Sequence, residues 1–145
     1  MDGMLESRRE AVRWYPDDLW IYLMAAQWRR IGQEEPFVGR AGSVGDDLGS
    51  SIVTSRMCRE IMRLAFLQER THAPYSKWFG SAFSQLECGD ALTPIFRAAV
   101  SAAHWRERED NLTEAYRIVA ELHNELGLGV TLSTEIRGFH DRPYR

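Results

Sequence analysis

The sequence predicts an all-α protein built as a bundle of four to five helices. Apolar residues recur every three to four positions through most of the chain, which is the spacing of one side of a helix. Capping residues, prolines and glycines stand at the ends of these apolar segments, where helices begin and end. The connections between the segments are short, as in helical bundles.

The first helix is predicted over residues 16–35. Pro16 suits its first turn, and Asp17 and Asp18 complement the positive end of the helix dipole. The main apolar stripe consists of Trp20, Leu23, Met24, Gln27, Trp28 and Ile31. The other sides also carry apolar residues, namely Leu19, Ile21 and Tyr22. A helix that is apolar on nearly all sides is central or is covered by a partner, and Pro36 is expected to end it.

The second helix is predicted to run from Ser50 or Ser51, either of which would serve as its N-cap, to about Arg70. Its core side carries Val53, Met57, Ile61 and Leu64. A proline turn at Ala73-Pro74 then introduces a short amphipathic segment within residues 74–87.

A third long helix is predicted to open at Thr93-Pro94, an N-cap and first-turn pair, and to continue through Ala103. The last long helix is predicted from Asn111, which has capping-box spacing with Glu114, to a stop at Gly127. Its apolar stripe contains Leu112, Tyr116, Val119, His123 and Leu126.

Both ends of the chain are expected to be irregular. Residues 1–15 form a lead-in, and residues 128–145 form an irregular tail in which residues 130–132 could be extended. A single domain, residues 1–145, is expected to contain all the helices, because a chain of this length supports one core.

The composition excludes several classes of protein. Hydrophobic residues make up 44% of the chain and charged residues 27%, as in ordinary globular domains. The formal net charge of −3 gives no overall attraction to nucleic acid or to an anionic membrane, and no apolar run approaches the ~18 residues of a membrane helix. Cys58, Cys88, His104 and His140 show no metal-ligand spacing. We expect a reduced, cytoplasmic protein with no metal site and no cofactor in this chain.

Four glycines and two adjacent aspartates predict a loop within residues 33–51. This loop has neither the lysine of a P-loop nor the GxGxxG spacing of a dinucleotide site, so both nucleotide-loop interpretations fail. Two interpretations stay open. The loop either connects and caps two helices, or it faces a ligand through Arg40, Asp46 and converging backbone N–H groups.

Arginines in the second predicted helix follow the spacing i, i+3, i+7 and i+14, and therefore fall on one side of it. They are Arg56, Arg59, Arg63 and Arg70. In one interpretation they belong to a solvated surface with salt bridges, where Glu60 neutralises part of their charge. In the other they line a cleft and hold phosphate, sulfate or carboxylate through paired N–H groups.

The segment HAPYSKWFGSAF, residues 72–83, gathers Tyr75, Lys77 and Trp78 around a proline turn. Lys77 is a candidate anion ligand or general base if it is buried, and otherwise a lysine whose stem packs on aromatic anchors. On the last helix, His123 is either a core histidine with one hydrogen bond or a candidate catalytic base.

Much of the chain is similar to a known family. The similarity is carried by YPDDLWIYLMAAQWRRIGQEEPFVGRAGSVGDDLGS, RLAFLQERTHAPYSKWFGSAF, AYRIVAELHNELGL and FHDRPYR, and it covers nearly everything from about Arg13. These segments resemble an uncharacterised bacterial domain of unknown function, usually the C-terminal helical half of polymerase-β-like nucleotidyltransferases and often found in actinomycetes. The resemblance implies a helical wall that helps to bind a small acceptor substrate. The matching residues of the loop and turn are Gln33, Glu34, Arg40, Asp46, Tyr75, Lys77 and Trp78.

The catalytic half of such enzymes has no counterpart in this sequence, which contains no Asp-x-Asp pair to hold metal ions. The resemblance therefore implies either an isolated domain or, as we expect, a heteromer with a separate nucleotidyltransferase-like chain. That chain would hold any Mg and nucleotide. The apolar surface of residues 19–31 would then form the subunit interface.

The leading hypothesis is a helical substrate-binding subunit of a two-component enzyme in bacterial specialised metabolism, active only with its partner. It would hold a phosphate or sulfate beside a small acceptor, for nucleotidyl transfer or for intramolecular amine cyclisation with loss of sulfate, of the aziridine-forming type. The alternative is a non-catalytic binding or scaffold module. The candidate catalytic residues are Lys77 and His123. The candidate binding residues are Arg40, Asp46, Arg56, Arg59, Arg63, Tyr75 and Trp78.

Overall fold

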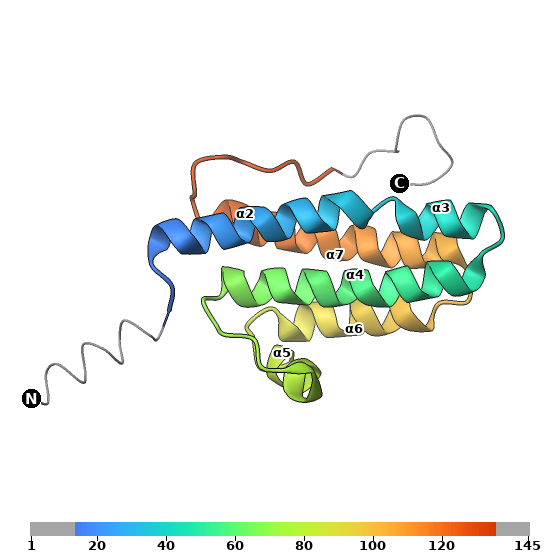
Figure 1. The fold of residues 1–145 in the computed structure, drawn as a ribbon, viewed down its shortest axis with the longest axis horizontal. Coiled ribbons are helices and arrows are strands. Elements are labelled where there is room, and N and C mark those ends of the chain that lie inside the picture. The colour runs from blue at the N-terminus through green and yellow to red at the C-terminus, as the bar shows by residue number, and fades with distance from the viewer. Residues whose placement is uncertain (1–13, 136–145) are drawn as a thin grey trace, which may run out of the picture.

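The computed structural model describes residues 14–135, and these residues form a bundle of helices (Figure 1). The elements in order are α2 (Asp17–Glu34), α3 (Phe37–Ser43), α4 (Asp47–Gln68), the 3-10 turn η1 (Ser76–Trp78), α5 (Phe79–Phe83), α6 (Gly89–Ser101) and α7 (Trp105–Glu125). Between residues 14 and 135 there is no strand, so the all-α prediction is confirmed. No helix in this range combines the length and apolar character needed to cross a membrane.

Helix α4 is the central element, because it packs against α2, α3, α6 and α7. In Figure 1, α2 and α4 lie side by side, α6 borders α4 on its other side, and α5 lies off the main bundle. The largest side chains of the core come from four of these helices and from α5. They include Met24, Ile31, Met57, Ile61, Leu64, Phe66, Phe83, Leu92 and Leu112.

The prediction for α2 is confirmed in both its length and its buried stripe. Trp20, Met24, Gln27 and Ile31 are buried, at the helical spacing expected for one side. On the other sides of α2 the apolar residues stay in solvent: the exposed fractions are 42% for Leu19, 44% for Ile21 and 68% for Tyr22. The described part of the chain thus leaves an apolar surface on α2 uncovered.

The predicted loop over residues 33–51 is wrong in part, because α3 lies inside it. Helix α4 also begins before Gly49 and not after it. Asp46 is its N-cap, and the Asp46 carboxylate accepts a hydrogen bond from the Gly49 backbone N–H at 2.8 Å. The cap comes earlier than predicted because an aspartate side chain satisfies a first-turn donor better than the later serines can from inside the helix.

The end predicted for the second helix, about Arg70, lies beyond the observed end. Helix α4 stops at Gln68, and Arg70 follows it with a positive φ of 51°. A left-handed residue at this place ends the helix, so Arg70 does not continue the arginine row of α4.

The starts predicted for the last two helices are wrong. Helix α6 begins at Gly89, and Pro94 lies inside it. Helix α7 begins at Trp105 with His104 as its N-cap, because His104 Nδ1 accepts from the Arg106 N–H at 3.1 Å. The predicted stop of the last helix is confirmed, since Gly127 has a φ of 65° just beyond it.

The segment after α7 is hydrogen-bonded to the bundle through the Asn124 side chain. The Asn124 amide accepts from the Leu132 N–H at 2.8 Å and donates to the Leu132 carbonyl at 3.0 Å. Residues 128–135 have no helix or strand, and Figure 1 shows this segment passing alongside α2. The rest of the predicted tail, residues 136–145, and most of the lead-in, residues 1–13, lie outside the described range.

Candidate functional site

A cavity of about 400 Å³ lies between α2 and α4 and is bordered by residues 71–74. We call it the α2–α4 cavity. The side chains that line it include two arginines, four aromatic or imidazole rings and the Gln27 amide. The rings and arginines are Trp14, Tyr15, Arg30, Arg63, Phe66 and His72. The cavity therefore combines flat apolar walls with positive charge.

Arg63 supplies the clearest chemical signal in this cavity. Its Nε atom is buried and has no hydrogen-bond partner, and no ion pair formed by residues 14–135 includes this side chain. An unsatisfied buried donor of a charged group costs at least ~1–3 kcal/mol. An anion in the cavity would satisfy the donor and balance the charge.

The second arginine of the cavity has a partner, but a distant one. Arg30 Nη1 lies 3.9 Å from a carboxylate oxygen of Glu60. That carboxylate also accepts from Gln27 Nε2 at 2.6 Å, and Glu60 is only 5% exposed. Glu60 was predicted to neutralise part of the arginine row of its own helix. Its contacts reach across to α2 instead, and Arg63 stays uncompensated.

Three rings form the end of the cavity that is nearest the start of α2. The ring centroids of Trp14 and Tyr15 are 4.9 Å apart. The centroid of the His72 ring lies 4.9 Å from that of Trp14 and 5.1 Å from that of Tyr15. Such a cluster offers a surface on which a flat or apolar part of a ligand packs. Trp14, Tyr15 and Arg30 are not among the binding residues predicted from the sequence. These residues come close to Arg63 only in the folded chain. The one hint in the sequence is the pair of adjacent aromatic residues, Trp14 and Tyr15, just before the helix.

The arginines predicted to share one cleft have different surroundings. Arg56 pairs with Glu34 of α2 at 2.8 Å, and Arg70 lies over the Trp20 ring at 4.2 Å from its centroid. Arg59 lies over the Phe79 ring at 5.6 Å from its centroid, and both residues line a different cavity. Among these side chains, Arg63 alone lines the α2–α4 cavity. The row is therefore not gathered around one recess.

The hollow beside Arg59 lies between α4, α5 and α6, has a volume of about 890 Å³ and is called here the α4–α6 groove. Phe79, Phe83 and Phe96 form much of its lining, together with Arg97 and several serines. It is larger and more open than the α2–α4 cavity. It is a second place where guanidinium groups meet an apolar surface.

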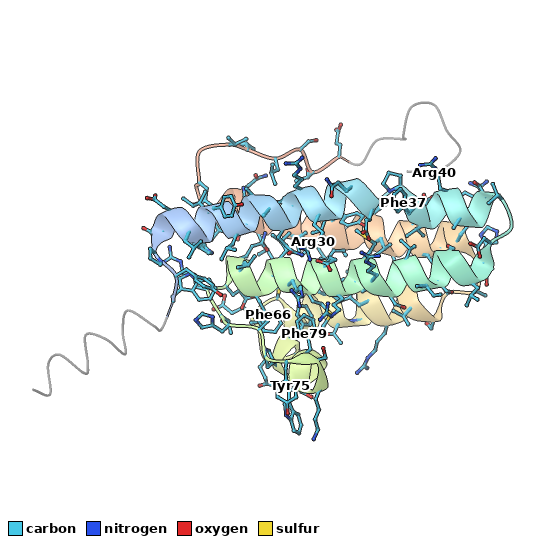
Figure 2. The ribbon with its side chains drawn as sticks, in the orientation of Figure 1. Arg30, Phe37, Arg40, Phe66, Tyr75 and Phe79 are labelled. Atoms are coloured by element: carbon cyan, nitrogen blue, oxygen red, sulfur yellow. The ribbon has the colours of Figure 1, made fainter. Side chains whose placement is uncertain are left out.

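The two predicted loop residues, Arg40 and Asp46, do not meet the turn residues. Arg40 is exposed on α3, where it lies 6.0 Å from the centroid of Phe37, and Asp46 caps α4. Figure 2 shows Arg40 and Tyr75 at opposite edges of the molecule, with Arg30 between α2 and α4. These contacts favour the interpretation of residues 33–51 as a capped connection.

The turn residues contact one another at the surface. Trp78 Nε1 donates to the Tyr75 hydroxyl at 3.0 Å, and Lys77 Nζ lies 5.0 Å from the Trp78 ring centroid. Tyr75, Lys77 and Trp78 are all exposed and line neither the α2–α4 cavity nor the α4–α6 groove. In this position Lys77 has the contacts of a lysine packed on an aromatic anchor.

His123 lies on α7 beside α2. Its Nδ1 accepts a hydrogen bond from Trp28 Nε1 at 3.1 Å, and burial lowers the pKa of the imidazole. The neutral form is the one that accepts this bond, so the lowered pKa and the contact agree. In this arrangement His123 holds the Trp28 indole in place, as a partly buried histidine with one hydrogen bond.

Within the described ranges, no three or more His, Cys, Asp or Glu side chains are grouped so as to hold a metal ion. The two cysteines, Cys58 and Cys88, are buried and free, and burial raises the pKa of both thiols, that of Cys58 to about 12. Neither thiol is therefore a ready nucleophile or metal ligand at neutral pH.

Comparison with known proteins gives one family. The model described as Domain of unknown function (DUF4037) matches residues 1–79, which is more than half of the chain. The matched range ends at the first residue of α5 and includes every residue that lines the α2–α4 cavity. No curated protein and no solved structure matches the sequence.

Proposed function

The chain belongs to the DUF4037 family, and on that premise we propose that it is the anion-binding helical part of a nucleotidyltransferase-like enzyme. It would hold the phosphate or sulfate group of a small molecule in the α2–α4 cavity. One observation carries this proposal: the buried Arg63 Nε has no partner although it borders a cavity of about 400 Å³. The location of the whole cavity within the family-matched residues supports it.

Different residues of the cavity would contact different parts of the ligand. Arg63 would donate to the anion through its guanidinium, and Arg30 would add a second positive charge from the opposite helix. Trp14 and Tyr15 would contact the apolar or flat remainder of the molecule. The buried Glu60 carboxylate, which accepts from the Gln27 amide, would keep Arg30 in position without itself lining the cavity.

The chemistry proposed for the complete enzyme follows from holding an anion at this place. A partner chain of the nucleotidyltransferase type would supply Mg and nucleotide for transfer to a small acceptor. In the other reaction, an amine nitrogen of the same substrate attacks the carbon that bears sulfate. The C–N bond forms, the C–O bond breaks, sulfate leaves with the electron pair, and solvent takes the nitrogen proton. Arg63 would stabilise the departing charge.

Binding of inorganic sulfate and pyrophosphate, measured by isothermal titration calorimetry at low ionic strength, tests the site. We expect Arg63→Gln to weaken binding at least tenfold, which corresponds to about 1.4 kcal/mol. Arg29→Gln is the matched control, because it removes one exposed arginine of α2 that does not line the cavity. Equal affinities for the wild type and both variants would contradict the proposal, and circular dichroism checks that each variant is folded.

The alternative function, a non-catalytic binding module, is favoured by one set of contacts. Lys77 and His123, the candidate groups for proton transfer, both lie outside the α2–α4 cavity and contact aromatic rings. A turnover assay with the partner chain separates the two functions. If the partner alone turns over as fast as the complex, the chain is a scaffold; if turnover needs this chain and intact Arg63, it is part of the enzyme.

A further inference from the structure

The α4–α6 groove has an extended apolar lining. The apolar side chains that line it are Cys58, Met62, Phe79, Phe83, Phe96 and Val100. The cysteine and the three phenylalanines among them are almost completely buried. Figure 2 shows Phe79 between α5 and α4, so the short helix supplies one wall of the groove. Such a lining accepts the apolar part of a small molecule.

Two guanidinium groups supply the charge of this groove. No aspartate or glutamate lines it, and no ion pair formed between residues 14 and 135 includes Arg59 or Arg97. Both arginines are exposed at the edge of the groove, where an incoming ligand would meet them. The groove is therefore complementary to a molecule that is apolar over most of its length and carries negative charge.

The two arginines lie at nearly the same height along the groove. The Glu69 carboxylate, directly after α4, accepts from the Glu87 and Cys88 N–H groups just before α6. The end of α4 therefore lies beside the start of α6, and Figure 1 shows the two helices running in opposite directions. Arg59 is nine positions before the end of α4, and Arg97 is eight positions after the start of α6. Because both helices rise by about 1.5 Å per residue, one anionic group could contact both side chains.

The donors of the two long walls favour a carboxylate over a phosphate. The lining residues 55–62 and 93–101 belong to α4 and α6, whose backbone N–H groups are bonded within the helices. Only side chains remain as donors there, and one of them, the Thr93 hydroxyl, is buried without a hydrogen-bond partner. Phosphate is commonly held by free backbone N–H groups. A carboxylate has two oxygens in one plane, and a single guanidinium pairs with both.

We propose that the α4–α6 groove binds an aliphatic carboxylate, the ionised form of a medium-chain fatty acid. The carboxylate would lie between Arg59 and Arg97, and the alkyl chain would lie along the phenylalanine rings. The volume of about 890 Å³ lies within the range of about 300–1,000 Å³ that is typical of small-molecule sites. The groove shares no lining residue with the α2–α4 cavity, so this proposal does not depend on the proposed function.

Titration of the whole chain with sodium octanoate at pH 7, followed in two-dimensional amide NMR spectra, tests the proposal. Butanoate has the same head group on a shorter chain, and octylammonium has the same chain with the opposite charge. We expect octanoate to bind at least tenfold more tightly than butanoate, because each buried methylene strengthens binding roughly fourfold. Octylammonium should not bind in the groove. Equal affinities of octanoate and either control ligand would overturn the proposal.

The same spectra locate the site. The amide signals of Gly80 and Val100, which line the groove from α5 and α6, are expected to shift as octanoate is added. The signal of Ala73, which borders the α2–α4 cavity, should stay in place. A shift at Ala73 without shifts at Gly80 and Val100 would mean that the carboxylate occupies the other cavity, and would refute the assignment.

Variants of one arginine test the contact with the head group. Arg97→Gln is expected to weaken octanoate binding at least tenfold, and Arg97→Lys, which keeps the positive charge, should weaken it less. Arg29→Gln is the matched control, because it removes an exposed arginine of α2 that lines neither the groove nor the α2–α4 cavity. Amide spectra show whether each variant is folded. Unchanged octanoate affinity in a folded Arg97→Gln variant would contradict the proposal.

Discussion

At the scale of single residues, the buried polar atoms without partners mark the places where this bundle is chemically incomplete. Several of these atoms belong to residues that line open spaces: Arg63 Nε and Trp14 Nε1 at the α2–α4 cavity, the Thr93 hydroxyl at the α4–α6 groove, and the Tyr116 hydroxyl at a smaller cavity between α2 and α7. Most buried polar groups in folded proteins are satisfied, so an exception beside an open space points to a ligand or an ordered water.

The raised pKa of Glu35 predicts how stability depends on pH. Between the ordinary carboxyl pKa and the higher folded-state pKa, the folded chain holds more protons than the unfolded chain, so the free energy of unfolding falls as pH rises through this window. Glu109 and Tyr116 of α7 face the same carboxyl, and ionised Glu109 increases the effect.

We therefore expect Glu35→Gln to raise the thermal midpoint relative to wild type at pH 8, because the amide removes a charge that is costly to bury. The difference should shrink as the pH falls toward 4, where Glu35 is protonated in the wild type. Midpoints measured by circular dichroism from pH 4 to pH 8 check this. A constant difference across the range would mean that Glu35 titrates at its ordinary value.

At the scale of the elements, the ends of helices are decided partly by neighbours and partly by distant residues. Asp46 caps α4 from the adjacent position. Just before α6, the Glu69 carboxylate at the end of α4 accepts from the Glu87 and Cys88 N–H groups at 2.7 Å and 3.1 Å, so a distant residue holds the chain where α6 begins. Gly42 of α3 packs so closely on Trp105 that an added Cβ would lie 2.2 Å from the indole.

Asp46→Ala is expected to lower the free energy of unfolding by about 1 kcal/mol, because the Gly49 N–H would lose its capping acceptor. For a domain of this size, the thermal midpoint should fall by roughly 3 °C. Asp46→Asn keeps an acceptor and should lose much less. If Asp46→Ala instead changes sulfate binding and leaves the midpoint unaltered, Asp46 belongs to a ligand site and not to the cap.

At the scale of the whole molecule, the bundle has an unequal distribution of covered and uncovered apolar surface. Helix α4 is covered on several sides by α2, α3, α6 and α7, whereas Leu19, Ile21 and Tyr22 of α2 stay in solvent. Scattered exposed apolar residues are ordinary, but Leu19 and Tyr22 are three positions apart and adjacent on the helix surface, so together they suit a partner. Within the proposed two-component enzyme, this is the surface expected to contact the catalytic chain.

Tyr22→Asp is therefore expected to prevent co-purification with a nucleotidyltransferase-like chain encoded beside this protein. A buried, unpaired carboxylate at the interface would cost several kcal/mol. Val130→Asp, on the exposed segment after α7, is the control and should leave the complex intact. Size-exclusion chromatography with light scattering measures both. If the complex still forms with Tyr22→Asp, this surface of α2 is not the interface.

The sequence by itself determined the fold class, the extent and buried stripe of α2, and the stop at Gly127, because each depends on spacing and on signals within a few residues. The wrong starts of α6 and α7 have different causes, because Glu69 contacts the residues before α6 from 18 positions away, whereas His104 is a local but uncommon cap of α7. Only the tertiary structure decided which arginine has no partner. Arg56, Arg59 and Arg63 share one helix and one spacing, yet a carboxylate from α2 pairs with the first, the Phe79 ring contacts the second, and a cavity borders the third. Charge balance and cavities arise between elements, and residue spacing along one helix carries no information about the opposite wall.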